Sequence, residues 1–203
     1  MFSFETNRKF ESNRKIEAIV ATDQGFGLAK NGQIPWKSKT DMIFFKETTT
    51  KNIVVMGSKT LLSLKNQLPL PNRLNIVLTR EPSKFINNDK YKELDNILFL
   101  NDTEFDNFIK NPTLLIKAEH NKFLKNDPTI FIIGGDQIYS KYCNICSTIW
   151  FTKIKANYEC DLIFSYNSVL FNTKQYNYNV YYEDDELQIM RCQLPLDLDS
   201  LPK

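Results

Sequence analysis

The chain has 203 residues, of which 42% are hydrophobic and 25% charged, and its formal net charge is +2. These proportions are ordinary for a globular protein that buries a sizeable core, and they argue against nucleic acid or an anionic membrane as the main partner. No apolar run approaches the roughly 20 residues that span a bilayer, and the first fifteen residues are polar, without a signal core or transit pattern. We therefore expect a cytoplasmic protein with a polar N-terminal extension at residues 1–15 and a single domain at residues 16–203.

The cysteines give little support for a metal or redox site. Cys143 and Cys146 have the spacing of a redox or zinc pair, but Cys160 and Cys192 do not form a second pair. The single histidine, His120, cannot complete a zinc site alone. We expect four reduced thiols and no metal.

A strand, a glycine-containing loop and a helix are predicted near the start of the chain. Residues 16–21 form an apolar run of strand length. Ser38 and Asp41 have capping-box spacing, which predicts a helix that begins there and ends near residues 48–50. Asp41 and Phe45 then share one helical face, where a carboxylate beside an aromatic ring suits a flat, nitrogen-rich ligand. Taken alone, the pattern also fits a simple helix cap with Phe45 in the core.

The next elements alternate between strand and helix. Apolar runs at residues 53–56 and 74–78 predict buried strands, with a helix from residue 58 to about residue 64 between them. Further strands are expected at residues 129–133, followed by a helix, and at residues 148–154. This alternation favours right-handed crossovers and a mainly parallel sheet.

Two regions depart from that alternation. Residues 81–127 are the least regular part, and we expect surface decoration with a strand at 97–100 and helices at 102–109 and 113–124. The last predicted element is an antiparallel edge hairpin, in which residues 176–182 and 187–192 flank an acidic turn.

Three predicted strands end in small, hydroxylic or basic residues, at Gly57-Ser58-Lys59-Thr60, Thr79-Arg80 and Gly134-Gly135. In an open α/β sheet, ligands bind outside the carboxyl ends of the strands, where helix amides and basic side chains can hold phosphates. Each end alone also fits an ordinary turn, but together they favour a dinucleotide-sized ligand. A nucleotide-triphosphatase phosphate loop is excluded because Ser58 precedes the lysine, and the usual dinucleotide fingerprint is missing.

The order and spacing of these motifs resemble the dihydrofolate reductase family over residues 16–164. The motifs are Asn31-Gly32, Ile34-Pro35-Trp36, Asp41, Phe45, Thr48-Thr49-Thr50, Val55-Met56-Gly57 with Lys59-Thr60, Pro69 to Arg73, Val77-Leu78-Thr79-Arg80, and Ile133-Gly134-Gly135 with Tyr139. The resemblance implies an α/β fold with an eight-stranded, mainly parallel sheet flanked by helices. It also implies NADPH-dependent reduction of 7,8-dihydrofolate to tetrahydrofolate, which supplies one-carbon units for thymidylate and purine synthesis.

On the substrate side, Asp41 resembles the buried acid that hydrogen-bonds the pterin and promotes protonation of its N5, with a pKa raised by burial. Thr152 resembles the threonine that orients this acid. Arg73 resembles the arginine that clamps the α-carboxylate of the folate glutamate. The implied catalytic residues are Asp41, Thr152 and Tyr139, and the implied substrate-binding residues are Ile19, Asp41, Phe45, Leu64, Arg73 and Ile133, with the backbone carbonyls of Ile19 and Ile133 facing the pterin.

On the cofactor side, the loop from Gln24 to Gln33 resembles a mobile lid over the nicotinamide, and the Gly134–Gly135 peptide is expected to be cis. The implied cofactor-binding residues are Ala21, Gly27, Leu28, Asn31, Gly32, Gln33, Gly57, Ser58, Lys59, Thr60, Thr79, Arg80, Gly134, Gly135, Asp136, Gln137, Ile138 and Tyr139. Two of these positions, and Ala29 of the lid, depart from the usual pattern. Ser58 replaces a basic residue, Ala29 replaces a lid glycine, and Asp136 places an acid where it could weaken phosphate binding.

The length leaves no room for a thymidylate synthase domain, so we expect a monofunctional reductase. We also expect it to be a monomer. Its expected partners are dihydrofolate and antifolates such as methotrexate. Two alternatives remain at this point. One is a reductase of riboflavin synthesis with the same fold, which has no need for Arg73 or the Trp36–Asp41 pair. The other is a folate- or nucleotide-binding protein that has lost turnover.

Overall fold

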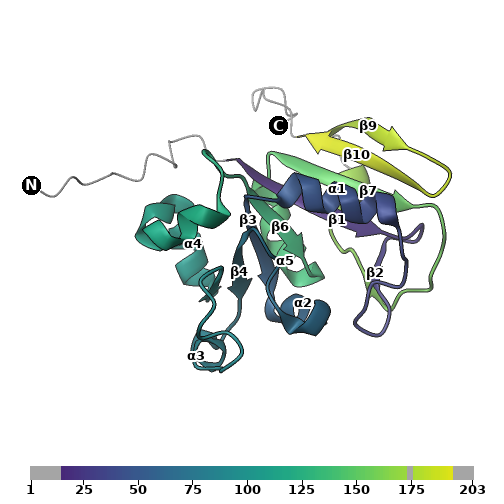
Figure 1. Cartoon of the computed structure of the whole chain (residues 1–203). Helices are drawn as coiled ribbons and strands as arrows, with labels where there is room; N and C mark the ends of the chain where they lie inside the picture. The colour runs from purple at the N-terminus through teal and green to yellow at the C-terminus, as the bar shows by residue number, and fades with distance from the viewer. Residues whose placement is uncertain (1–14, 173–175, 194–203) are drawn as a thin grey trace, which may run out of the picture. The chain divides into compact units, whose positions relative to one another are not determined.

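The computed structural model describes residues 15–172 and 176–193 (Figure 1), so the predicted extension at residues 1–15 lies outside this part except for Lys15. The strands are β1 (Ile16–Thr22), β2 (Gly27–Ala29), β3 (Ile53–Gly57), β4 (Leu74–Leu78), β5 (Ile97–Leu100), β6 (Ile130–Gly134), β7 (Thr148–Ile154), β8 (Leu162–Ile163), β9 (Asn177–Glu183) and β10 (Leu187–Gln193). The helices are α1 (Lys39–Thr49), α2 (Ser58–Ser63), α3 (Pro82–Ile86), α4 (Asp102–Lys110), α5 (Asp136–Tyr142) and α6 (Asn167–Asn172). Four short 3₁₀ turns complete the described elements: η1 (Lys65–Gln67), η2 (Pro112–Leu114), η3 (Ala118–Phe123) and η4 (Cys143–Ile145).

The predicted fold class is confirmed. Eight strands form one sheet in the order β5-β4-β3-β6-β1-β7-β10-β9, and β2 and β8 form a separate pair. The pairs β3–β4, β4–β5 and β1–β7 are parallel, whereas β10 runs antiparallel to both β7 and β9. None of the helices in the described part of the chain has both the length and the hydropathy that crossing a bilayer needs.

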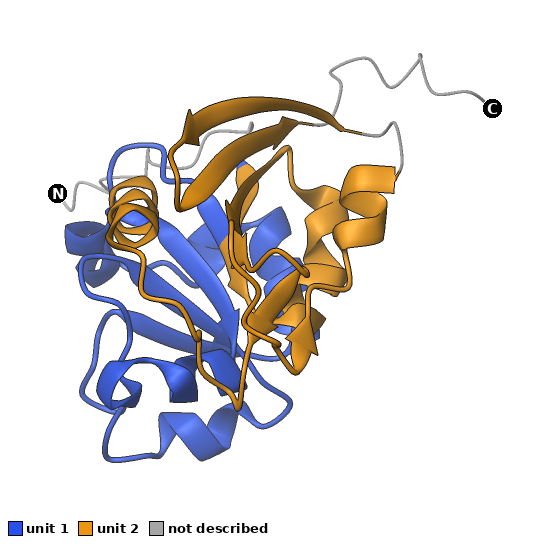
Figure 2. Ribbon diagram, turned by 90° about the vertical axis from the view of Figure 1, so that its right-hand side faces the viewer, with its two compact units in different colours: residues 1–15, 49–131 blue, residues 16–48, 132–203 orange. Residues whose placement is uncertain are grey.

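The chain divides into two compact units (Figure 2). Unit 1 comprises residues 1–15 and 49–131, and unit 2 comprises residues 16–48 and 132–203. Each unit carries some of the predicted site residues, so the units are described one after the other.

In unit 1, the parallel strands β3 and β4 set the position of two predicted phosphate-binding loops. Their register runs from Ile53 opposite Leu74 to Gly57 opposite Leu78. All five residues of β4 are buried, as are the first four of β3, because these runs are almost purely apolar. Since both strands end level with each other, Ser58–Thr60 and Thr79–Arg80 leave the sheet side by side.

The prediction for residues 81–127 was partly wrong. The strand at 97–100 and the helix at 102–109 are confirmed as β5 and α4, but residues 113–124 form η2 and η3 instead of one α-helix, and α3 was not foreseen. Pro112 opens η2, and the backbone N–H of Lys117 donates to Nδ1 of His120 at 3.0 Å, a local bond that replaces a helical one.

This segment is also more than surface decoration, because it contributes aromatic residues to the interior of unit 1. Phe105 and Phe108 are almost completely buried, with ring centroids 6.0 Å apart. The Phe99 ring stacks on Phe85 at 5.1 Å and contacts Tyr91 at 5.4 Å. The irregular segment therefore forms part of the core of unit 1.

In unit 2, α1 packs Phe44 against β7 and β10. The ring of Phe44 meets Trp150 edge to face at 5.6 Å. Phe44 also contacts a buried cluster formed by Trp36, Ile154, Leu187 and Ile189. This packing fixes the helix that carries Asp41, and the predicted edge hairpin is confirmed as β9 and β10.

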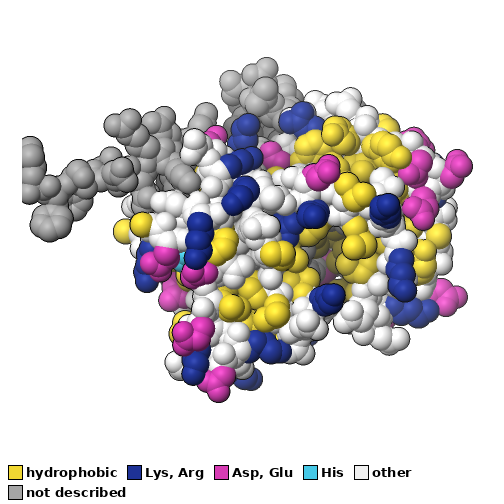
Figure 3. Space-filling model, viewed as in Figure 1, with side chains coloured by type: hydrophobic (Ala, Val, Ile, Leu, Met, Phe, Trp, Pro, Cys, Tyr) yellow, Lys and Arg dark blue, Asp and Glu magenta, His cyan; other side chains and the backbone are white. Residues whose placement is uncertain are grey.

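The outer strand of that hairpin, β9, is exposed along its whole length. Hydrophobic side chains gather at the upper right of Figure 3. The large hydrophobic side chains that β9 exposes are Tyr178, Val180, Tyr181 and Tyr182. A bulge between Ile189 and Met190 of β10 interrupts the register of the hairpin, a common feature of sheet edges.

The four cysteines are free thiols in the structure, and Cys143, Cys146 and Cys192 are buried. The hydrogen bond with Cys143, together with burial, raises the pKa of the Cys146 thiol well above its usual value. Such thiols are poor nucleophiles and poor metal ligands. Within residues 15–172 and 176–193, no three potential metal ligands come together.

Candidate active site

The structure brings Asp41 and Thr152 together within unit 2. The backbone N–H of Asp41 donates to the Ser38 hydroxyl at 3.3 Å, so Ser38 caps α1 as predicted. The Asp41 carboxylate instead pairs with the Thr152 hydroxyl, which lies on β7 and is itself buried. Burial raises the pKa of Asp41 above its usual value, and the hydrogen bond from Thr152 opposes that rise. Asp41 therefore retains a proton at higher pH than an exposed aspartate does.

Phe45 lies one helical turn after Asp41 and is half-buried. Ala21 lies opposite Thr152 in the β1–β7 register, and Ile19 lies opposite Trp150. The register thus places Ile19 and Ala21 on β1, beside the strand that carries Thr152.

Tyr139 is buried, and its hydroxyl donates to the backbone carbonyl of Ile19 at 2.8 Å. Burial raises the pKa of this phenol well above its usual value, so the hydroxyl acts as a donor. The ring covers Gly134, where φ is +118° and an added Cβ would lie 3.1 Å from it. The Ile19 carbonyl, expected to face the pterin, thus also holds Tyr139 in place, and Ile133 is half-buried.

The predicted cofactor residues at the start of α5 include a cis peptide bond and a carboxylate that binds Ser165. The Gly134–Gly135 peptide bond is cis, as the resemblance implied. Asp136, expected to weaken phosphate binding, directs its carboxylate to Ser165, whose backbone N–H and hydroxyl both donate to it at 2.7 and 2.6 Å. Two donors from the segment that follows β8 therefore hold this carboxylate in place. Gln137 is exposed and Ile138 half-buried.

The predicted lid lies against the segment that contains β8. Strand β2 pairs antiparallel with β8, and the N–H of Asp161 donates to the Ala29 carbonyl at 3.1 Å. At the tip, the N–H of Asn31 donates to Asp161 Oδ2 at 2.7 Å. Asn31 and Gly32 both have positive φ, which lets the chain reverse between Lys30 and Gln33. The lid residues Gly27, Leu28, Asn31, Gly32 and Gln33 are thus held as one hairpin-like loop.

Gly27→Ala tests how tightly this loop is packed. An added Cβ would lie 2.3 Å from Cys160 Cβ and 2.6 Å from its sulfur, a contact that requires the backbone to move. We expect a loss of about 1–3 kcal/mol in the free energy of unfolding, measured by denaturant titration. Cys160→Gly, which removes the opposing atoms, should restore part of that stability in the double variant. Equal stability of wild type and Gly27→Ala would contradict this packing.

In unit 1, the residues predicted to hold the cofactor phosphates occupy the ends of β3 and β4. Gly57 is the N-cap of α2, and Ser58 and Thr60 are half-buried in its first turn. Lys59 and Arg80 are exposed. The Thr79 hydroxyl accepts a hydrogen bond from the Glu81 N–H at 3.2 Å. Two cations and three hydroxyls are therefore gathered at adjacent strand ends, a donor set that suits an anion.

Arg73, also in unit 1, is 4% exposed, and burial lowers the pKa of its guanidinium. Its Nη2 donates to the Thr50 hydroxyl at 3.4 Å. The Asn75 amide accepts from the Leu70 N–H at 2.9 Å and donates to the carbonyls of Leu70 and Arg73 at 2.9 and 3.2 Å. These contacts hold the loop before Arg73 in place, and Leu64 lies half-buried at the end of α2.

A family model described as dihydrofolate reductase matches residues 15–194. The chain belongs to the dihydrofolate reductase family. Its relatives include the dihydrofolate reductase of Staphylococcus haemolyticus, 31% identical over 150 residues that cover 74% of this chain and 76% of the relative. The dihydrofolate reductase of Aedes albopictus is 29% identical over 161 residues, or 74% and 79% of the two chains.

Other relatives are longer, and the chain spans only 28% of the bifunctional dihydrofolate reductase-thymidylate synthase of Daucus carota, to which it is 33% identical over 161 residues and 74% of its own length. Among solved structures, the dihydrofolate reductase of Enterococcus faecalis complexed with NADP(H) and RAB-propyl superposes with a TM-score of 0.62. The two sequences are 22% identical, and the match covers 89% of this chain and 96% of the Enterococcus faecalis chain. This likeness supports the dihydrofolate reductase fold.

Sequence reasoning missed three residues that position predicted site residues of this family member. Thr50 holds Arg73, Asn75 holds the loop before it, and Asp23 binds the lid backbone through Gly25 and Gly27. Asn75 carried a signal, because it is the one polar residue in the apolar run of residues 74–78. Thr50 belongs to the Thr48-Thr49-Thr50 motif, but the motif does not show that its partner is Arg73. Asp23 carried no signal, since its partners depend on the folded backbone.

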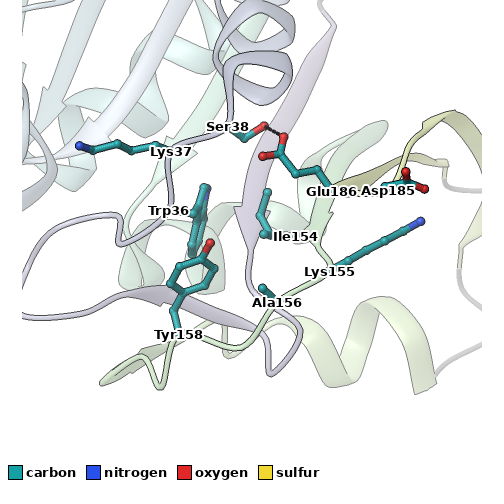
Figure 4. Close-up of a pocket in the computed structure, with 9 residues that line it drawn as sticks. All are labelled: Trp36, Lys37, Ser38, Ile154, Lys155, Ala156, Tyr158, Asp185 and Glu186. Atoms are coloured by element: carbon teal, nitrogen blue, oxygen red, sulfur yellow. Dashed lines mark hydrogen bonds between the residues drawn. The ribbon is translucent and has the colours of Figure 1, made fainter.

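Unit 2 has a hollow of about 160 Å³, and Asp41 is not among its lining residues. Figure 4 shows the residues that line it. The rings of Trp36 and Tyr158 form one wall, and the Ser38 hydroxyl donates to Glu186 Oε2 at 3.3 Å across another. The remaining lining residues are Lys37, Ile154, Lys155, Ala156 and Asp185. The hollow marks the junction of the lid end with the β9–β10 turn rather than the predicted pterin site.

Proposed function

We propose that the chain is an NADPH-dependent dihydrofolate reductase that converts 7,8-dihydrofolate to 5,6,7,8-tetrahydrofolate. Membership of the family supports the proposal, and the observation that carries it is Asp41. This acid is positioned by the Thr152 hydroxyl and has a pKa raised by burial. A partly buried acid of this kind is typical of a group that takes part in proton transfer.

On the substrate side, the ionised Asp41 would accept two parallel hydrogen bonds from the amino group and ring nitrogen of the pterin. Its raised pKa allows it to hold a proton nearer to neutral pH and so to promote protonation of N5 through the pterin and water. Thr152 fixes the orientation of the carboxyl group. Arg73 would bind the α-carboxylate of the glutamate, with its guanidinium held by Thr50.

Each unit carries predicted cofactor residues whose chemistry suits part of an anionic dinucleotide. Lys59 and Arg80 are exposed beside the hydroxyls of Thr60 and Thr79, and Asp136 is engaged by Ser165. Gly134 accommodates the Tyr139 ring, since a side chain there would meet it at 3.1 Å. NADPH, when bound, supplies the hydride. The lid residues would exclude water from the reacting atoms.

The test is the loss of near-ultraviolet absorbance of the reduced nicotinamide when purified protein is mixed with NADPH and dihydrofolate. We expect methotrexate-sensitive oxidation of NADPH and slower oxidation of NADH. Tight folate binding without turnover would favour a binding protein instead. Absence of folate binding would favour a riboflavin-type reductase, and either result would overturn the proposal.

Ser58→Arg tests the cofactor preference that this proposal includes. The change adds a guanidinium beside Lys59 at the start of α2, where it can pair with a 2′-phosphate but has no partner on NADH. One added exposed charge pair contributes about 1 kcal/mol, so the ratio of kcat/KM for NADPH over NADH should rise roughly fivefold. Ser63→Arg, at the other end of the helix, is the control. An unchanged ratio would show that Ser58 does not face the 2′-phosphate.

Four further parts of the proposal come from the sequence. The enzyme is proposed to act as a monomer, in the cytoplasm, with residues 16–203 as one reductase domain that also binds antifolates such as methotrexate. Sedimentation of the purified protein at assay concentration tests the first of these directly.

A further inference from the structure

Asp23 is the first residue after β1, and the residue is 1% exposed. Oδ1 accepts hydrogen bonds from the backbone N–H groups of Gly25 at 2.8 Å and Gly27 at 2.7 Å. Oδ2 accepts from the N–H of Tyr158 at 2.9 Å, and the Cys160 thiol is a fourth hydrogen-bonding partner. A single carboxylate therefore joins the start of the lid to residues 158–160.

The charge of Asp23 makes these bonds strong. Burial raises the pKa of its carboxyl, but the bonds from Tyr158, Gly27, Cys160 and Gly25 outweigh burial, and the pKa lies below the usual value. Asp23 is thus ionised at neutral pH. Hydrogen bonds to a buried charge are stronger than neutral ones, and losing one leaves part of that charge unsatisfied.

The backbone of the same turn reinforces this arrangement. The Asp23 N–H donates to the Gly27 carbonyl at 2.9 Å, and the Phe26 N–H donates to the Asp23 carbonyl at 3.1 Å. Phe26 has a φ of +64°, and its ring packs on Phe171 at 5.6 Å. Residues 23–27 therefore form a closed turn that ends where β2 begins.

The other end of the lid reaches the same segment through an aromatic contact. The ring of Trp36, which follows the lid, lies 5.8 Å from the ring of Tyr158, and Figure 4 shows the two side by side. Between the ends, the Lys30 ammonium donates to the Tyr158 carbonyl at 3.2 Å. The start, middle and end of the lid thus converge on Tyr158, whose N–H is held by Asp23.

We propose that Asp23 is a positioning residue of the reductase, and that its carboxylate holds the lid on residues 156–161 in the arrangement that encloses the nicotinamide. This inference rests on the proposed function. Asp23 belongs to none of the predicted substrate or cofactor contacts, and it acts through Gly25, Gly27 and Tyr158. The lid of this chain is accordingly anchored at its base by a buried charge, in addition to the exposed contact of Asp161 at its tip.

Two substitutions separate the contacts of Asp23. Asp23→Asn keeps a carbonyl oxygen for Gly25 and Gly27 but turns an NH₂ group toward the Tyr158 N–H, so it breaks only the link to residues 156–161. Asp23→Ala removes all the side-chain bonds. Asp89→Asn is the matched control, since Asp89 is exposed, pairs with Lys92 and lies in unit 1.

The first measurement is amide hydrogen exchange of the protein without ligands. In Asp23→Asn we expect the Tyr158 amide to exchange about tenfold faster, with a smaller change at Gly27. In Asp23→Ala the amides of Gly25, Gly27 and Tyr158 should all exchange at least tenfold faster. Amides of β3 and β4 should keep their wild-type rates in both variants. Unchanged lid amides, or a uniform increase over the whole chain, would overturn the proposal.

The second measurement separates this inference from the proposed function. In an active wild type, we expect Asp23→Asn to raise the NADPH dissociation constant and lower kcat by roughly five- to tenfold each, with the dihydrofolate KM nearly unchanged. A purely structural role would not produce that split. An inactive wild type would refute the proposed function, whereas an active wild type with an equally active Asp23→Ala would refute the role of Asp23 alone.

Discussion

Asp41→Asn should lower kcat for dihydrofolate reduction near neutral pH by roughly two to four orders of magnitude, the range expected for loss of a proton-transfer group. Asparagine has the shape of aspartate, and its carbonyl oxygen can still accept the hydrogen bond from Thr152. It cannot carry the negative charge that binds the pterin edge, and it cannot hold the proton. Because Asp41 is not among the predicted cofactor contacts, the NADPH dissociation constant should change little.

The same substitution has a stability signature whose sign follows from the pKa of Asp41. Burial raises this pKa in the folded state above the value of 3.8, so the folded state binds the proton more tightly than the unfolded state does. The protonated carboxyl thus contributes stability at low pH that is lost as the pH rises through the raised folded pKa. Asparagine does not ionise, so the Asp41→Asn variant does not lose this stability as the pH rises. The variant should therefore have a higher Tm than wild type at neutral pH, and the difference should shrink toward pH 4 and below.

Thr152→Val separates the acid from its positioning group. Valine removes the hydroxyl while leaving Asp41 in place, so we expect a loss of about tenfold in kcat and a shift of the pH profile to higher pH, because the bond that lowers the Asp41 pKa is gone.

An Asp41→Asn enzyme with full activity would refute the assigned role of Asp41. An Asp41→Asn enzyme that is less stable than wild type at neutral pH would refute the claim that this carboxylate is held at the expense of stability.

The features that the sequence predicted well are those set by local patterns. Apolar runs such as residues 53–56 and 74–78 can only be satisfied by burial on both faces, so β3 and β4 follow directly from composition. The cap of α1 by Ser38 was predictable because the contact joins residues only three positions apart. In the irregular segment, the local signal failed: Pro112 and the His120 side chain satisfied backbone groups in ways that helical periodicity does not report.

The contacts that position the candidate site join residues far apart in the chain, and no local pattern encodes them. Asp23 and Tyr158 are 135 positions apart, and Lys30 meets the Tyr158 carbonyl across 128 positions. Asp136 illustrates the same limit, since its sign alone suggested repulsion of a phosphate and only the fold revealed Ser165 as its donor. A residue type thus indicates the chemistry available, whereas the fold determines which partner uses it.

Arg73→Lys should raise the dihydrofolate KM by roughly 10- to 100-fold while leaving kcat at saturation and the NADPH dissociation constant nearly unchanged. A guanidinium can bind a carboxylate through two parallel N–H groups, whereas an ammonium is a point charge, and a charge-assisted hydrogen bond contributes about 1.5–3 kcal/mol. Burial lowers the pKa of Arg73, but arginine is not deprotonated in proteins, so its charge persists throughout the assay range.

The decisive control for Arg73 is a substrate without the glutamate. Dihydropteroate lacks the α-carboxylate, so wild type and Arg73→Lys should reduce it with the same KM. Thr50→Val keeps the guanidinium but removes the hydroxyl that accepts from it, so its KM for dihydrofolate should rise by a smaller factor. Because Arg73 is buried, urea unfolding of each variant checks that the fold persists. If Arg73→Lys weakened dihydrofolate and dihydropteroate equally, the arginine would stabilise the loop before it and would not bind the substrate carboxylate.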